Sequence, residues 1–174
     1  MELRSERPED IDAIRAVQAA AFRRPDQPNK VPMEAPLVDA LRADPDAWIA
    51  ELSVVAIGET DEVIGHVVCS RAWVGESRHP VLGLGPIGVR PDRQGDGIGS
   101  ALVREAVAIA AARSEGLIGL LGDPAYYRRF GFVRSTDHGV EPPDPAWGEH
   151  FQVLPLASHD PSISGRFQYA AAFG

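Results

Sequence analysis

The feature that most constrains the fold is a glycine-rich junction at residues 85–99, which joins a strand to a helix. A short apolar run predicts the strand at 81–89, and Gly95, Gly97 and Gly99 follow at the start of the helix. Glycine lacks the Cβ atom that keeps a ligand away from the backbone. The first amides of a helix also lack intrahelical acceptors and carry partial positive charge. The junction therefore predicts a binding site for a phosphate or pyrophosphate.

The junction lies inside a strand–helix–strand unit. Apolar residues at helical spacing predict a helix over 98–113, and its broad apolar face suits packing flat on a sheet. Residues 117–121 form an unbroken apolar run typical of a buried strand. Two strands joined through a helix favour parallel pairing with a right-handed crossover.

The rest of the chain predicts a mixture of strands and helices. Strands are predicted at 2–4, 48–57, 63–73, 151–156 and 167–170, and further helices at 8–22, 33–43 and 125–130. The strands at 48–57 and 63–73 form a predicted antiparallel hairpin. Asp123 followed by Pro124 predicts the start of the helix at 125–130. The length fits one domain over residues 1–174.

Two motifs carry a resemblance to a known family. The spacing Gln94-x-x-Gly97-x-Gly99 after an apolar strand resembles the acyl-CoA-binding signature of the GCN5-related N-acetyltransferases (GNAT), Gln/Arg-x-x-Gly-x-Gly/Ala. The family often places a tyrosine four residues before a Gly-Phe pair, and Tyr127 stands in that position before Gly131 and Phe132. The two motifs occur in the family's order and separation, and the resemblance is strongest from 82 to 132.

The resemblance implies a fold and a reaction. The implied fold is mixed α/β: a single GNAT-type domain with a central, mostly antiparallel sheet, one parallel βαβ pair at the CoA site and helices on both faces. The implied reaction is direct transfer of an acetyl group from acetyl-CoA, in a ternary complex, to a primary amine of a small molecule or a protein.

The resemblance also assigns site residues. Ile87, Gly88 and Val89 would pair with the pantetheine arm and polarise the thioester carbonyl. The backbone around the glycine motif would hold the CoA pyrophosphate. The cofactor-binding residues implied there are Gln94, Gly95, Asp96, Gly97, Ile98, Gly99 and Ser100.

Acyl transfer to an amine needs a neutral amine and benefits from a proton for the leaving thiolate. Tyr127 is the predicted proton donor by its place in the family motif. Tyr126 is the neighbouring alternative, and it would face about 100° away on a helix. The strand at 81–89 has no carboxylate, so the general base stays open between Glu34, Glu51, Glu76 and a chain of waters. The variable segments 24–32 and 137–147 are expected to line the acceptor groove.

Another motif is rejected as a nucleotide site. Gly83-x-Gly85-x-x-Gly88 matches the dinucleotide-binding fingerprint, which needs a helix directly after it. Pro91 disfavours a helix at Arg90, so the fingerprint lacks its context. A nucleotide-dependent oxidoreductase and a non-catalytic acyl-CoA-binding module are the alternatives to the transferase.

Composition limits the partners and the cellular location expected for the protein. The net charge of −8 and pI near 5.1 argue against a nucleic-acid partner. No apolar run approaches the ~20 residues of a membrane span. Cys69 is the only cysteine, so no disulfide forms within the chain and a cytoplasmic location is predicted. The five histidines lack metal spacing. A homodimer through the late strands is a further expectation by analogy with the family.

Overall fold

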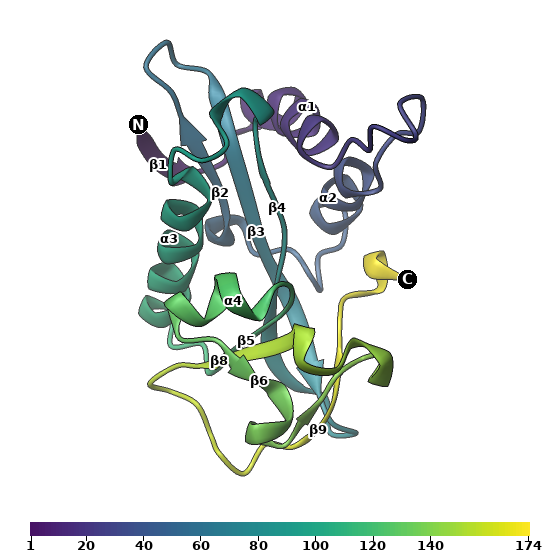
Figure 1. Cartoon of the computed structure of the whole chain (residues 1–174). Coiled ribbons are helices and arrows are strands. Elements are labelled where there is room, and N and C mark those ends of the chain that lie inside the picture. The colour runs from purple at the N-terminus through teal and green to yellow at the C-terminus, as the bar shows by residue number, and fades with distance from the viewer.

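A computed structural model describes residues 1–174, and at its centre lies a nine-stranded sheet (Figure 1). Its strands are β1 (Glu2–Ser5), β2 (Ser53–Ile57), β3 (Val63–Val74), β4 (His79–Val89), β5 (Leu117–Leu121), β6 (Val133–Arg134), β7 (Val140–Glu141), β8 (Phe151–Pro155) and β9 (Gly165–Gln168). The order across the sheet is β1-β2-β3-β4-β5-β8-β6, and β9 pairs with both β3 and β7.

The pairing is mostly antiparallel, as the family resemblance implied. β2 and β3 form the predicted hairpin, with Ser53 opposite Val68. β4 and β5 are parallel and are joined through α3 (Ile98–Ala112), which confirms the predicted strand–helix–strand unit. A second parallel pairing, only two residues long, joins β7 to β9 and was not predicted.

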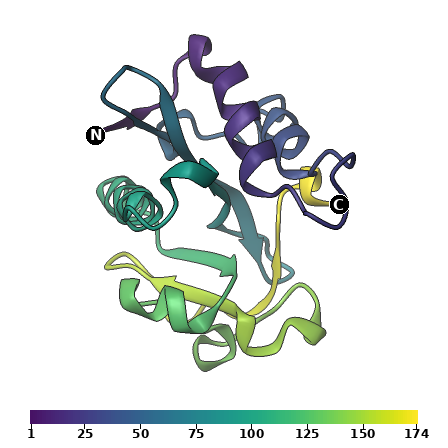
Figure 2. The ribbon, with the colours of Figure 1, turned by 45° about the horizontal axis from the view of Figure 1, so that its top comes forward.

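Helices cover both faces of the sheet. α1 (Ile11–Ala21) and α2 (Glu34–Arg42) lie on one face and α3 lies on the other, as Figures 1 and 2 both show. The short α4 (Pro124–Tyr127) follows β5. This layering follows from amphipathic patterning, because each helix turns one apolar stripe to the sheet. No helix combines the length and apolar character needed to cross a bilayer.

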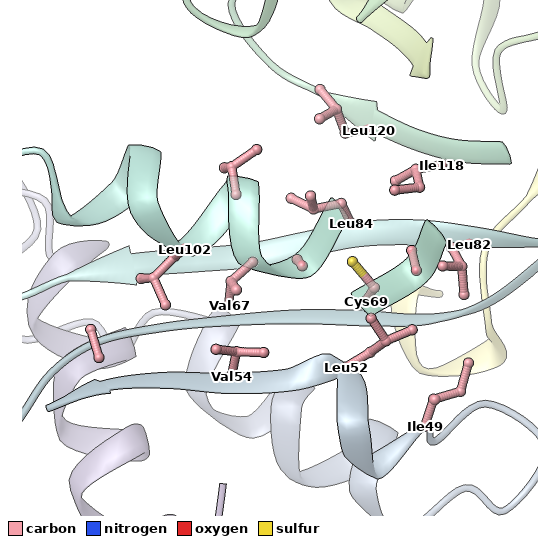
Figure 3. Packing of buried hydrophobic residues seen from close by; sticks show 14 of the residues in the cluster. Ile49, Leu52, Val54, Val67, Cys69, Leu82, Leu84, Leu102, Ile118 and Leu120 are labelled. Carbon is pink, nitrogen blue, oxygen red and sulfur yellow. The ribbon is translucent and has the colours of Figure 1, made fainter. Parts of the chain in front are cut away.

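Two large apolar clusters lie on opposite faces of the sheet, and alternate side chains of β2 contribute to one or the other. Val54 and Ala56 point toward α3, whereas Val55 and Ile57 point toward α1 and α2. Figure 3 shows the first cluster, in which Leu102 of α3 lies over the sheet near Val54 and Val67. Gly65 allows this close packing, since a Cβ atom there would lie 2.9 Å from side-chain atoms of Ile98 and Leu102.

Some predicted boundaries were wrong for reasons of tertiary packing. The strand expected at 48–57 begins only at Ser53, because Ala50–Leu52 forms a 3-10 turn that buries Leu52 beneath α3. β6 and β7 occur in a segment in which no strand was predicted. Each contributes two residues to ladders with β8 and β9, too few for any alternation to be visible in the sequence.

Candidate active site

β4 and β5 separate in the middle of the sheet. Their parallel ladder consists of Leu82 opposite Ile118 and Gly83 opposite Gly119. Beyond Gly83 the facing edges of the two strands have no strand partner, while β4 stays paired with β3 as far as Val89. The later half of β4, which includes Ile87, Gly88 and Val89, therefore leaves one edge of its backbone open to a ligand.

An irregularity in β4 marks the point of separation. The register against β3 shifts between Ile87, opposite Val67, and Leu84, opposite Cys69, so that Gly85 and Pro86 fall in a bulge. Gly85 has φ +138°, a conformation that other residues rarely adopt. Bulges bend a strand and redirect its backbone, and they are common beside active sites.

The glycine junction forms the start of α3. Gly95 and Gly97 have φ +89° and +81°, and Gly97 is the residue at the N-cap. A Cβ atom at either position would meet no other atom within 4 Å, so the space above both is open. The amides there are exposed at the positive end of the helix dipole, which suits an anionic ligand.

The other residues of the junction shape this helix start. The Gln94 side chain donates through Nε2 to the Val89 carbonyl at 3.1 Å, which ties the turn to the end of β4. Ile98 is buried against the sheet and anchors the helix. Asp96 accepts a hydrogen bond from Arg93 at 3.1 Å, and this cation offsets the negative charge of Asp96 beside the glycine turn. Arg93 also lies 3.9 Å from Glu62.

The two adjacent tyrosines face different neighbours. The Tyr126 hydroxyl lies 3.3 Å from Ser100 Oγ, and a Cβ atom on Gly99 would be 3.3 Å from the same hydroxyl. The Tyr126 side chain, from α4, therefore contacts the first turn of α3. Tyr127 packs against the apolar cluster beneath α3 and lines the large cavity beside β4.

Local contacts hold Tyr127 in place. Asp123 caps α4 by accepting from the Ala125 amide at 2.9 Å, as its place before Pro124 predicted. The Tyr127 ring lies over Gly122, where a Cβ atom would come within 2.4 Å of it. Burial, and to a lesser extent the neighbouring Tyr126, raises the pKa of Tyr127 to about 12. The hydroxyl therefore keeps its proton at neutral pH and can donate it.

The cavity has a volume of about 1030 Å³. One wall is the bulged part of β4, Leu84 to Ile87, and the opposite side is formed by Leu121, Gly122 and Tyr127. The residues that follow β7, the strand β9 with the segment after it, and the ends of α1 and α2 complete the walls. The cavity thus begins where β4 and β5 part and extends toward α2.

The three carboxylates considered as general bases lie in different places. Glu34, at the start of α2, lines the cavity. Glu51 is outside it and forms an ion pair with Arg113 at 2.9 Å. Glu76 lies in the turn between β3 and β4 and does not line the cavity either. Of the predicted bases, only Glu34 shares a cavity with Tyr127.

The predicted acceptor segments divide between two pockets. Pro143, Asp144 and Trp147 of segment 137–147 line the large cavity. Residues of segment 24–32 instead line a smaller pocket of about 260 Å³, which shares Phe22 and Glu34 with the large one.

Sequence reasoning missed the contribution of the last segment to the cavity. Tyr169 and Phe173 line it, although they lie more than 40 residues beyond Tyr127 in the sequence. Burial raises the pKa of Tyr169, and a backbone hydrogen bond at Leu121 opposes part of that shift. Aromatic residues near the end of a chain carry no signal for such a position, because any apolar cluster could have received them.

The rejected nucleotide fingerprint has a structural explanation. Gly83 faces the Tyr169 ring, and a Cβ atom there would come within 2.8 Å of the ring. A Cβ atom at Gly88 would come within 2.7 Å of Gln18 Oε1. Both glycines lie inside β4 and allow close packing, and no helix follows them directly.

Neither the single cysteine nor a metal ion has a place in this site. Cys69 is buried in the cluster beneath α3, and burial together with Glu115 raises the pKa of its thiol to about 12. The thiolate is therefore scarce, and Cys69 is unsuited to carry an acyl group. No three histidine, cysteine, aspartate or glutamate side chains are grouped so that they could hold a metal ion.

An open strand edge, a glycine-lined helix start and a cavity that holds a tyrosine fit a transferase that takes an acyl group from CoA. A sequence model of the Acetyltransferase (GNAT) family matches residues 12–132, and the chain belongs to this family. The uncharacterized N-acetyltransferase YhbS of Escherichia coli K12 is 31% identical over 150 residues, covering 78% of this chain and 89% of YhbS. The uncharacterized N-acetyltransferase YjhQ of the same strain is 33% identical over 167 residues, covering 92% and 87% of the two chains.

Solved structures share the whole fold. The crystal structure of Escherichia coli YhbS in complex with CoA superposes with a TM-score of 0.85 at 29% identity, covering 99% of this chain and 91% of that one. A GNAT family acetyltransferase from Brucella melitensis in complex with acetyl-CoA gives a TM-score of 0.79 at 36% identity, covering 99% and 97% of the two chains.

Proposed function

We propose that this chain transfers an acetyl group from acetyl-CoA to a primary amine, directly and within a ternary complex. The observation that carries the proposal is the continuity of three features along β4. The glycine-lined start of α3, the open backbone edge after Gly83 and the cavity with Tyr127 follow one another in space. Relatives of the same fold were crystallised with CoA and with acetyl-CoA.

The donor occupies the first two features. The amides from Gly95 to Ser100 bind the diphosphate, and the open edge at Ile87, Gly88 and Val89 pairs with the pantetheine arm. The bulge at Gly85 and Pro86 directs the acyl end toward the cavity. An amide donor near this point would polarise the thioester carbonyl and stabilise the developing oxyanion.

The acetyl group is then transferred to the amine inside the cavity. A neutral amine nitrogen forms a bond to the acyl carbon, and the carbon–sulfur bond breaks with its electron pair on sulfur. The Tyr127 hydroxyl donates a proton to this sulfur, and the proton released from nitrogen restores the hydroxyl. The Tyr127 hydroxyl is protonated at neutral pH, as a proton donor must be.

The proposal keeps the predicted setting of the protein: one domain over residues 1–174 and a cytoplasmic location. It also keeps a possible homodimer, for which sedimentation analysis is the test. β8 pairs with β5 and β6, and β9 pairs with β3 and β7, so a dimer through the late strands would use side chains on their faces.

Two measurements test the proposed function. Calorimetry compares binding of acetyl-CoA with binding of NAD, and a thiol-release assay screens amines of several classes with acetyl-CoA. Amine-dependent thiol release is the expected result. Binding of acetyl-CoA without release by any amine would favour a non-catalytic module, and binding of NAD instead of acetyl-CoA would favour an oxidoreductase.

A further inference from the structure

The part of the cavity beyond β4 is walled mainly by apolar and aromatic groups. Phe22, Leu37 and Phe173 line it beside α1 and α2, and Trp147 and Tyr169 line its remaining sides. All five are half-buried. Each therefore offers some apolar surface that no other part of the chain covers, as ligand cavities commonly do.

The aromatic wall is rigidly built. The rings of Tyr169 and Phe173 have centroids 4.5 Å apart, and the Tyr169 and Phe167 rings are 4.9 Å apart in an edge-to-face arrangement. Trp147 rests 6.1 Å from the ring of buried Phe151. Leu121, at the end of β5, adds a side chain that is 47% exposed inside the same cavity. A ring-sized apolar ligand would cover this surface.

One charged group in the cavity is unpaired. Asp123 and Asp144 each accept a hydrogen bond from a backbone amide, at 2.9 and 2.8 Å. Arg166 lies 3.7 Å from Glu141. The side chain of Glu34 has no hydrogen bond and no ion pair within the chain.

The position of Glu34 fits a cation-binding role. It is the first residue of α2, where the helix dipole favours a negative charge. In the cavity wall it lies among residues such as Phe22 and Leu37, and it also borders the adjoining smaller pocket, which Arg24 and Lys30 line. A carboxylate among apolar side chains attracts a cation more strongly than one in open water.

We propose, on the basis of the acetyl-transfer function above, that the acceptor is a small amine with one ring-sized apolar body, and that Glu34 binds its ammonium group. The walls come from separate elements on several sides, which suits a small molecule more than a side chain on a folded protein. A polyamine or an aminosugar would leave the aromatic walls uncovered. The bound ammonium loses one proton to solvent before its nitrogen attacks the thioester.

Thiol-release kinetics with matched amines test the acceptor class. The probes are 2-phenylethylamine, ethylamine, which lacks the ring, spermidine, and a short peptide with one lysine. We expect kcat/KM for 2-phenylethylamine to exceed that for ethylamine roughly 100-fold, the factor expected from burying a phenyl group. A higher kcat/KM for ethylamine, spermidine or the peptide would overturn the acceptor class and leave the acetyltransferase function standing.

Variants test the role of Glu34. Glu34→Gln is expected to raise KM for 2-phenylethylamine roughly 10-fold or more while leaving KM for acetyl-CoA unchanged, in line with losing a charge-assisted contact. Glu76→Gln is the matched control, since Glu76 is a carboxylate outside the cavity, and it should leave both KM values unchanged. An unchanged amine KM in Glu34→Gln would remove the assignment.

A binding experiment tests the inference if none of the probe amines is acetylated. Calorimetry then measures 2-phenylethylamine binding to the protein saturated with CoA. Binding that Glu34→Gln weakens and Glu76→Gln does not would support the acceptor site without turnover. An absence of amine binding would overturn this inference, whereas an absence of acetyl-CoA binding would overturn the proposed function itself.

Discussion

At the residue scale, Tyr126 and Tyr127 are neighbours in the sequence with separate surroundings. Their rings meet edge to face with centroids 4.9 Å apart. One hydroxyl reaches the first turn of α3 and the other side chain lines the cavity. This division follows from helical geometry, which rotates adjacent side chains by about 100°.

Tyr127→Phe should lower kcat roughly 100-fold, because general-acid catalysis by a positioned side chain contributes about that much. Affinity for acetyl-CoA should be unchanged, since the ring and its packing on Phe132 remain. Steady-state kinetics and calorimetry measure the two quantities. Tyr126→Phe is the matched control and should keep kcat. Full turnover by Tyr127→Phe would show that another group protonates the thiolate.

A buried polar chain on the α1 face is the second feature at this scale. The Ser53 hydroxyl donates to Glu6, so its oxygen accepts from His66 Nε2 at 2.8 Å. His66 Nδ1 then accepts from Gln18 Nε2 at 2.8 Å. Glu6 in turn pairs with Arg42 at 2.7 Å. This direction of donors requires a neutral imidazole, and burial lowers the pKa of His66 to about 3.

Stability should therefore decrease in acid. A buried neutral histidine stabilises the fold fully above its unfolded pKa of about 6.5, and protonation of the unfolded state removes that contribution as pH falls toward 3. The slope is roughly 1.4 kcal/mol per pH unit at most. Urea unfolding between pH 7 and pH 4 measures it. His66→Gln should be less stable at pH 7 and should show a smaller pH dependence, and equal slopes would contradict the assignment.

At the scale of elements, the turn between β4 and α3 both directs the chain into the helix and leaves backbone amides accessible. Positive φ at Gly95 and Gly97 turns the chain into the helix, and the missing Cβ atoms leave the amides open. Gln94 anchors the turn to Val89. Backbone conformation and ligand access therefore depend on the same residues.

Gly97→Ala should weaken acetyl-CoA binding by about tenfold or more, because the new methyl group would project into the space proposed for the diphosphate. Strain at φ +81° should also lower the free energy of unfolding by about 1 kcal/mol. Gly139→Ala is the matched control, since Gly139 has φ +71° and lies beside Ser164, away from the glycine junction. Calorimetry and urea unfolding separate the two effects. Equal acetyl-CoA affinity in both variants would argue against a ligand at Gly97.

At the scale of the whole molecule, the sheet is stabilised by apolar layers on both faces. The cluster beneath α3 joins residues of β2, β3, β4 and β5 (Figure 3). The cluster beneath α1 and α2 joins β2 and β3 to Ala170 near the end of the chain. β4 contributes Leu82 and Leu84 to the first cluster, and its Gly88 packs against Gln18 and Ala21 of α1, so β4 is supported on both faces.

Leu102→Ala should lower the free energy of unfolding by about 2–5 kcal/mol, the range for a fully buried leucine that leaves a cavity. Met33→Ala is the control, because Met33 is 76% exposed and its loss should change stability by less than about 0.5 kcal/mol. Urea unfolding at pH 7 measures both. Similar losses in the two variants would contradict the packing described for α3.

Local patterns were sufficient for the elements that carry most of the fold. Helical spacing predicted α1, α2 and α3 within a few residues, and the unbroken run at Leu117–Leu121 predicted β5. The motif around Gln94, Gly97 and Gly99 indicated the family before any packing was known. The two-residue strands β6 and β7 were missed, because pairs that short depend on neighbours from elsewhere in the chain.

The sequence by itself determined the strand–helix–strand unit, its glycine turn and the tyrosine of the second motif, since each depends on residues close together in the chain. Only the tertiary structure decided which tyrosine lines the cavity, that Glu34 alone of three carboxylates does so, and that Tyr169 and Phe173 complete the wall. The physical reason is the range of the interactions. Backbone conformation and helix periodicity are local, whereas a cavity forms where segments distant in sequence pack against one another.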